Sequence, residues 1–144
     1  MQGLGAFAFV VSGFALALFA SDMSDPEADE LLAKLLPKAE EGDADAQYEL
    51  AWRQALGSVL PLNDEQAVGW LVRAAENGHA LAQNNLGARY YAGDGVEKNL
   101  IEAFHWFYAA YQQGDRKAGK NLNSLIGELS DEDLARAKAR AGLT

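Results

Sequence analysis

Residues 82–110 read AQNNLGARYYAGDGVEKNLIEAFHWFYAA and contain two helical patterns separated by a short glycine-containing loop. In the first pattern Ala82, Leu86 and Tyr90 are spaced by four, which places them along one face of an α-helix. The Gly-Asp-Gly at 93–95 predicts the end of that helix, because glycine readily adopts the left-handed conformation found at helix C-termini.

The second pattern begins at Asn99, whose side chain can accept a backbone N–H at a helix start, and Glu102 follows three residues later. Ala103, Trp106 and Ala110 then recur at helical spacing. Small alanines allow two helices to approach closely, and the tryptophan can fill the space between them. The stretch therefore predicts a helical hairpin, and we expect Trp106 in its core.

The same pattern recurs at an offset of 36 residues. Between the two units, eleven of 36 positions are identical, against roughly two or three expected from ordinary composition. The identical pairs are Gly42/Gly78, Ala44/Ala80, Ala46/Ala82, Gln47/Gln83, Leu50/Leu86, Arg53/Arg89, Gly57/Gly93, Asn63/Asn99, Ala67/Ala103, Trp70/Trp106 and Ala74/Ala110. A third unit retains Gly114, Ala118 and Leu122. A fixed period of this length is typical of repeat architectures.

A helix pair of this kind cannot bury its apolar face alone, so it must stack on the next pair. We therefore expect an all-α fold, a right-handed α/α solenoid of stacked antiparallel helix pairs over residues 21–144. Its repeat units are expected at about 41–76 and 77–112. An N-terminal helix at about 25–40 and a C-terminal capping helix pair at about 115–141 should close the two ends.

Composition and charge exclude several functions. The formal net charge of the 144 residues is −9, which disfavours nucleic acid because phosphate binding needs a concentrated basic face. The chain has no cysteine, which removes disulfides, thiolate metal sites and cysteine nucleophiles. Only two histidines occur, His79 and His105, and the sequence places them 26 residues apart on different helices. We expect no cofactor and no metal.

Residues 1–20 are not expected to belong to the solenoid. The stretch 4–20 carries no charge, ends in Leu-Phe-Ala and is followed by an acidic segment. At this length it resembles the apolar core of a secretory signal peptide, which predicts a periplasmic or secreted protein. The segment before Leu4 lacks Lys and Arg, so an uncleaved N-terminal membrane anchor is the alternative.

The repeated motif resembles the Sel-one-like repeat family (SLR proteins), which are relatives of the tetratricopeptide solenoids. The resemblance rests on Leu86-Gly87, Tyr90, Gly93-Asp94-Gly95-Val96, Asn99, Ala103, Trp106 and Ala110, and extends over about residues 27–141. The first unit departs from the pattern at Ala51, Gln54 and Val59. The resemblance implies a non-enzymatic adaptor, scaffold or regulator that binds a protein or peptide, often in the bacterial periplasm.

In tetratricopeptide relatives the first helix of each pair lines a concave groove, and the shared register indicates which residues would face a partner here. They are Asp45, Tyr48, Trp52, Leu81, Asn84, Tyr91, Lys117 and Lys120, together with Ala55, Ala88 and Ser124. Our hypothesis is that the aromatic residues anchor a bound segment and the two lysines orient an acidic one. Equally, an aromatic residue off the main apolar stripe can simply cover a neighbouring helix.

No catalytic motif with a nucleophile and a base is found, so we expect no enzyme. The alternative function is a cell-envelope protein that binds a small ligand such as a peptidoglycan fragment or β-lactam, with hydrolase-like activity. It follows from cysteine-rich members of the resembled family, whose disulfides this chain lacks. The identity of the partner and the oligomeric state, including a homo-oligomer, stay open.

Overall fold

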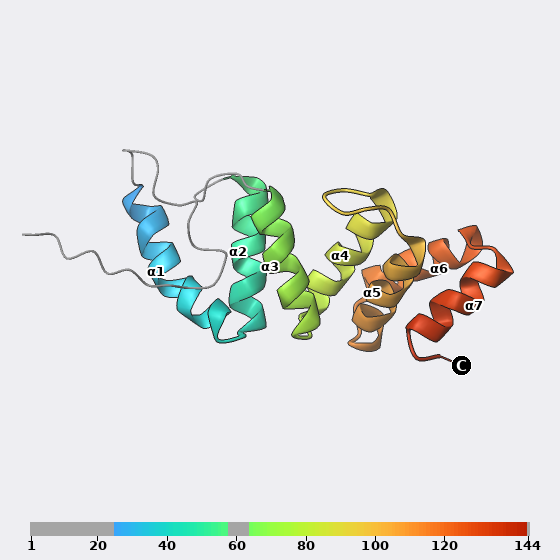
Figure 1. Cartoon of the computed structure of the whole chain (residues 1–144). Coiled ribbons are helices and arrows are strands. Elements are labelled where there is room, and N and C mark those ends of the chain that lie inside the picture. Colours follow the sequence, from blue (N-terminus) through green and yellow to red (C-terminus); the bar gives the residue numbers. More distant parts are fainter. Residues whose placement is uncertain (1–24, 58–63, 144) are drawn as a thin grey trace, which may run out of the picture.

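The computed structural model describes residues 25–57 and 64–143. These ranges contain seven helices and no strand, so the expected all-α solenoid is confirmed. The helices are α1 (Pro26–Glu40), α2 (Ala44–Leu56), α3 (Asp64–Glu76), α4 (Ala80–Ala92), α5 (Leu100–Gln112), α6 (Arg116–Glu128) and α7 (Asp131–Arg140). They follow one another in chain order along an elongated molecule (Figure 1). The signal or anchor expected at 1–20 lies outside these ranges, and none of the helices within them is long and apolar enough to cross a bilayer.

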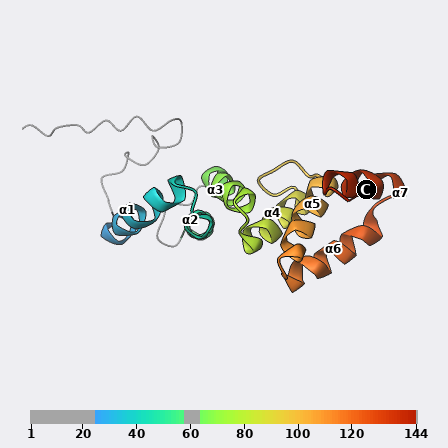
Figure 2. The same ribbon diagram turned by 90° about the horizontal axis from the view of Figure 1, so that it is seen from below.

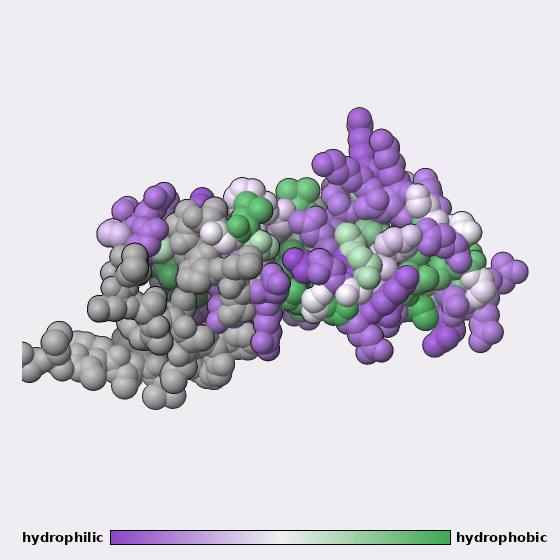
Figure 3. Space-filling view, turned by 90° about the horizontal axis from the view of Figure 1, so that it is seen from above, coloured by the Kyte–Doolittle hydropathy of each residue, from purple (hydrophilic) through white to green (hydrophobic). Residues whose placement is uncertain are grey.

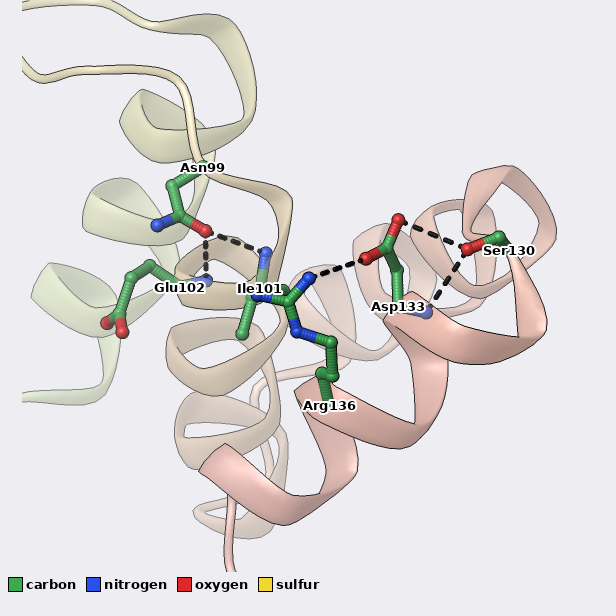
Figure 4. Close-up of polar contacts among 6 residues, drawn as sticks. All are labelled: Asn99, Ile101, Glu102, Ser130, Asp133 and Arg136. Atoms are coloured by element: carbon green, nitrogen blue, oxygen red, sulfur yellow. Dashed lines mark hydrogen bonds and ion pairs between the residues drawn. The ribbon is translucent and has the colours of Figure 1, made fainter.

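The helix starts follow from side chains that accept backbone N–H groups. Asp43, His79 and Asp115 lie 36 residues apart and cap α2, α4 and α6 in this way. Asn99 caps α5, as the sequence predicts, and Ser130 caps α7 (Figure 4). The matching cap expected at Asn63 lies outside the described residues.

The core consists of small residues at the repeated positions. Ala82, Leu86, Ala74 and Ala110 are completely buried. Larger side chains close the gaps between them: Trp70 packs against two successive core clusters, and Trp106 packs against the second of these. Both tryptophans thus contact the interior as expected, although each keeps part of its ring exposed.

The C-terminal helices depart from the pattern of the earlier pairs. Within the first two units the helices pack on each other, α2 on α3 and α4 on α5. The connection from α4 to α5 has seven residues, whereas only Leu129 and Ser130 connect α6 to α7. Helix α7 packs against α5 and does not lie along α6. Figure 2 shows α6 and α7 diverging from their connecting turn, so the two helices expected as a capping pair do not form a hairpin like the earlier ones.

Candidate partner-binding groove

One polar contact connects the first helices of successive units, α2 to α4 and α4 to α6. The Asn85 side-chain amide donates to the Tyr48 hydroxyl at 3.1 Å, and the Asn121 amide donates to Asn84 Oδ1 at 3.0 Å. Tyr48 and Asn84 occupy matched positions, as do Asn85 and Asn121. Each first helix is therefore joined to the next one by a side-chain hydrogen bond.

An open hollow of about 200 Å³ lies between α2 and α4, and Ala67 and Leu71 of α3 also line it. Its lining consists of Tyr48, Ala51, Trp52, Ala55, Ala67, Leu71, Asn85, Ala88 and Arg89. Trp52 is 51% exposed, an unusual state for a large aromatic side chain. The hollow thus brings together several of the residues expected to face a partner.

Tyr48 forms a fixed wall of this hollow. Its ring stacks on His79, with ring centroids 4.3 Å apart, while its hydroxyl accepts the hydrogen bond from Asn85. Asp45, which is exposed, lies with a carboxylate oxygen 3.4 Å from His79 Nε2. Burial lowers the pKa of His79, although Asp45 opposes the shift. A ring held on two sides loses little freedom when a partner contacts it.

Arg89 adds a cation that the sequence hypothesis left out of the groove. Its guanidinium contacts both the backbone carbonyl of Asp94, at 3.3 Å, and the side chain of Asp94, at 3.4 Å. It therefore holds the loop after α4, and it also lines the hollow. The identity of Arg53 and Arg89 at an offset of 36 was the sequence signal that could have singled out Arg89.

The residues expected on α4 lie in different surroundings. Leu81 is 51% exposed. Asn84 is only 9% exposed and forms the junction with Asn121, so it offers a partner little surface. Tyr91 is 37% exposed and donates to the Glu128 carboxylate at 2.8 Å, which raises the pKa of Tyr91. Sequence reasoning could not anticipate the partners of Asn84 and Tyr91, because both are supplied by the next unit.

Lys117 and Lys120 are exposed on α6. Lys120 lines a second hollow, of about 330 Å³, together with Tyr111, Arg116, Gly119, Leu122 and Asn123. The lysines are therefore separate from the hollow that contains Trp52. From above, hydrophilic side chains dominate the C-terminal half of the molecule, with apolar patches visible between them (Figure 3).

Neither histidine belongs to a catalytic arrangement in the described ranges. His79 Nδ1 accepts the backbone N–H of Ala82 at 3.1 Å, and His105 lies 3.4 Å from the Arg140 guanidinium. Burial, then the nearby Arg140, lowers the pKa of His105. Residues 25–57 and 64–143 contain no cluster of three or more His, Asp or Glu side chains able to hold a metal ion.

The Sel1 repeat family matches two consecutive stretches, residues 44–79 and 80–115, which together are half of the chain. Each match begins at the first residue of a first helix, α2 or α4. The chain therefore belongs to the Sel1 repeat family. Repeats of this family generally mediate protein–protein interactions, and proteins with this fold are typically non-enzymatic scaffolds.

Two solved structures show the same architecture. One is the crystal structure of c5321, a protective antigen present in uropathogenic Escherichia coli strains that displays an SLR fold; the TM-score is 0.71 and the identity 28%, over 80% of this chain and 25% of that chain. The other is a Sel1 repeat protein from Oxalobacter formigenes, with a TM-score of 0.56 and 30% identity over 75% of this chain and 97% of that one. The present chain thus spans about a quarter of the c5321 chain. Among curated proteins no match was found.

Proposed function

We propose that this chain holds a segment of a partner protein on the surface formed by α2, α4 and α6, with Trp52 as its main anchor. The observation that carries the proposal is the position of Trp52, half exposed at the rim of a hollow that no described side chain fills. Tryptophan is enriched among the residues that dominate binding energy at protein interfaces. Burial of its exposed half by a partner would supply the hydrophobic part of the affinity.

The size of the hollow favours a protein segment over a small ligand. At about 200 Å³ it is smaller than the 300–1,000 Å³ of typical small-molecule sites, and it is open to solvent. It has room for an apolar side chain that projects from a longer segment. Asn85 and Arg89 at its edge offer hydrogen-bond donors to the backbone or to acidic side chains of that segment.

Charge indicates which segments are favoured. Lys117 and Lys120 make no ion pair with the described residues, whereas the chain as a whole is acidic. An acidic stretch beyond the anchored side chain would be attracted to this basic end of the surface. Electrostatic complementarity of this kind sets orientation and association rate more than affinity.

The test begins with capture of partners from the native cell envelope on the immobilised chain, followed by affinity measurement with each purified partner. Trp52→Ala should weaken the specific partner at least tenfold, or about 1.4 kcal/mol. Leu56→Ala is the matched control, because Leu56 is 55% exposed on the same helix but does not line the hollow. Equal affinities of the Trp52→Ala variant and the wild type would exclude the groove as the binding site.

We also propose that the chain is exported and meets its partner outside the cytoplasm. Support comes from the uncharged stretch at 4–20 and the acidic segment after it. N-terminal sequencing of protein purified from native cells should begin at Ser21. Recovery of chains that begin at Met1 from the soluble cytoplasmic fraction would contradict export.

A further inference from the structure

Helix α6 lacks a cover that α2 and α4, the first helices of the two preceding units, both have. On α2, Ala51 and Gln54 are both buried, and the Gln54 amide donates to Gln66 of the paired helix α3. On α4, the matched Gly87 is buried against Phe107 of the paired helix α5. In both units this flank of the first helix is the seat of the second helix.

The same flank is bare on α6. Asn123 and Ile126 occupy the positions of Ala51 and Gln54, yet Asn123 is exposed and Ile126 is 37% exposed. The reason is that α7 packs against α5 and diverges from α6 (Figure 2). We call Gly119, Asn123 and Ile126, which lie one helical turn apart, the open flank of α6.

Tyr111 at the end of α5 borders this flank. Its side chain is 53% exposed and lies so close to Gly119 that a Cβ there would meet the ring at 2.9 Å. Tyr111 and the flank enclose the hollow of about 330 Å³, whose other lining residues include Arg116, Lys120 and Leu122. The surface therefore combines apolar groups with two cations.

These cations are unusual for their position. Arg116, Lys117 and Lys120 occupy the first turns of α6, where the helix dipole is positive and acidic residues are preferred. None of them forms an ion pair with a described residue, and Asp115 uses its carboxylate to cap the helix. The second helices α3, α5 and α7 begin with acidic side chains instead. An anionic partner would compensate the repulsion within this cluster.

We propose that the open flank of α6 binds an amphipathic helix of a partner protein that carries acidic residues opposite Arg116 and Lys120. A helix fits because α3 and α5 occupy the matching flanks of α2 and α4. Acidic residues fit because two cations, Arg116 and Lys120, border the seat. The occupant would complete the third helical pair of the solenoid, on a surface that does not include the Trp52 hollow.

The probe is a stapled, fluorescein-labelled peptide of residues 64–76, the helix seated on the matching flank of α2. In a matched probe Asp64, Glu65 and Glu76 are replaced by Gln. Fluorescence anisotropy with the full chain should give an affinity for the acidic probe about tenfold higher than for the neutral probe. The double variant Arg116→Glu with Lys120→Glu should weaken the acidic probe by about tenfold or more, and Ile126→Asp should weaken both probes.

Lys34→Glu with Lys38→Glu is the control. These two exposed lysines make no ion pair with described residues. Like Arg116 and Lys120 they lie four residues apart, and their replacement changes the net charge by the same amount. This control variant should bind the acidic probe with an affinity within about twofold of the wild type. Trp52→Ala should do the same, because Trp52 belongs to the groove and not to the open flank. If the charge reversal unfolds the chain, as circular dichroism would show, Arg116→Gln with Lys120→Gln replaces it. Equal binding of the two probes, or unchanged binding by the flank variants, overturns the proposal. The proposal is also overturned if sedimentation shows that the wild-type chain is a dimer and that Ile126→Asp abolishes this dimer. A second copy of the chain would then occupy the flank.

Discussion

Gln47 and Gln83 make the same pair of hydrogen bonds in successive units. The Gln47 amide donates to the Ala39 carbonyl at 2.8 Å, and the Gln83 amide donates to the Ala75 carbonyl at 3.1 Å. The side-chain oxygen of Gln47 accepts from Asn77, and that of Gln83 accepts from Gln113. Each buried carboxamide thus connects the end of the preceding second helix to the end of its own unit.

Replacement of Gln83 should destabilise the fold although the substitute is apolar. Gln83→Leu removes the hydrogen bond to the Ala75 carbonyl and the one accepted from Gln113, each worth about 0.5–1.5 kcal/mol. Gln112→Leu, at an exposed position, should change stability by less than about 0.5 kcal/mol. Urea unfolding followed by circular dichroism measures both, and equal midpoints for the two variants would contradict the role of the carboxamide.

Stability should decrease as the pH falls below about 6.5, the ordinary histidine pKa. The pKa values of His79 and His105 are both lowered in the folded chain, so the unfolded chain binds protons more readily. The stability present above pH 6.5 is therefore lost as the pH falls toward the folded pKa values. For His79 the loss has a structural cause, since protonation of Nδ1 removes the acceptor that caps α4.

The variant His79→Asn keeps a capping side chain without the titration and avoids placing a second carboxylate beside Asp45. Its free energy of unfolding should decrease less between pH 7 and pH 5 than that of the wild type, with His105 supplying the remaining dependence. Chemical unfolding at a series of pH values measures this. If the free energy of unfolding of the variant depended on pH as strongly as that of the wild type, the cap would not be coupled to proton binding.

Replacement by alanine should change the stability of the fold in opposite directions at two helical glycines, Gly87 and Gly127. A Cβ at Gly87 would lie 2.7 Å from the buried ring of Phe107, whereas nothing lies within 4 Å of a Cβ at Gly127. Gly87→Ala should therefore destabilise by about 1–3 kcal/mol through overpacking, less the helix propensity that alanine gains. Gly127→Ala should stabilise by about 0.5–1 kcal/mol. Thermal unfolding of both variants distinguishes packing from propensity, and stabilisation by Gly87→Ala would contradict the close contact.

Trp52 should dominate the quenching of tryptophan fluorescence by iodide. It is half exposed, whereas Trp70 packs on the core beneath the Arg73 guanidinium, 4.6 Å from the ring centroid. Trp52→Phe should remove most of the quenching, and Trp70→Phe should leave most of it. Similar quenching in the two variants would show that Trp52 is shielded in solution and would remove the basis of the proposed groove.

The repeat and its helices could be predicted because each unit carries its own signals. Asn99 and Ser130 indicate helix starts, and the alanines and leucines that recur at an offset of 36 indicate the buried face of the helices. These features depend on residues close together in the chain. For the same reason the family resemblance was visible in residues 82–110 alone.

The surroundings of individual surface residues could not be predicted in this way. Asn84 has the register of a groove residue, but Asn121 of the next unit covers it. The capping role of His79 was also missed, although its match to Asp43 and Asp115 was a usable signal. The divergence of α7 from α6 could not be predicted either, because it accompanies packing against α5, a contact between residues far apart in the chain.

The interior is divided among three clusters of buried side chains placed successively along the chain. Because neighbouring clusters share few residues, one end of the molecule can open while the remainder stays folded. Amide hydrogens of α4 and α5 would then be the slowest to exchange, and those of α1 and α7 the fastest. A surface built across several units, as the groove is, therefore exists only while the units stay docked, which makes recognition by this chain sensitive to fraying at its ends.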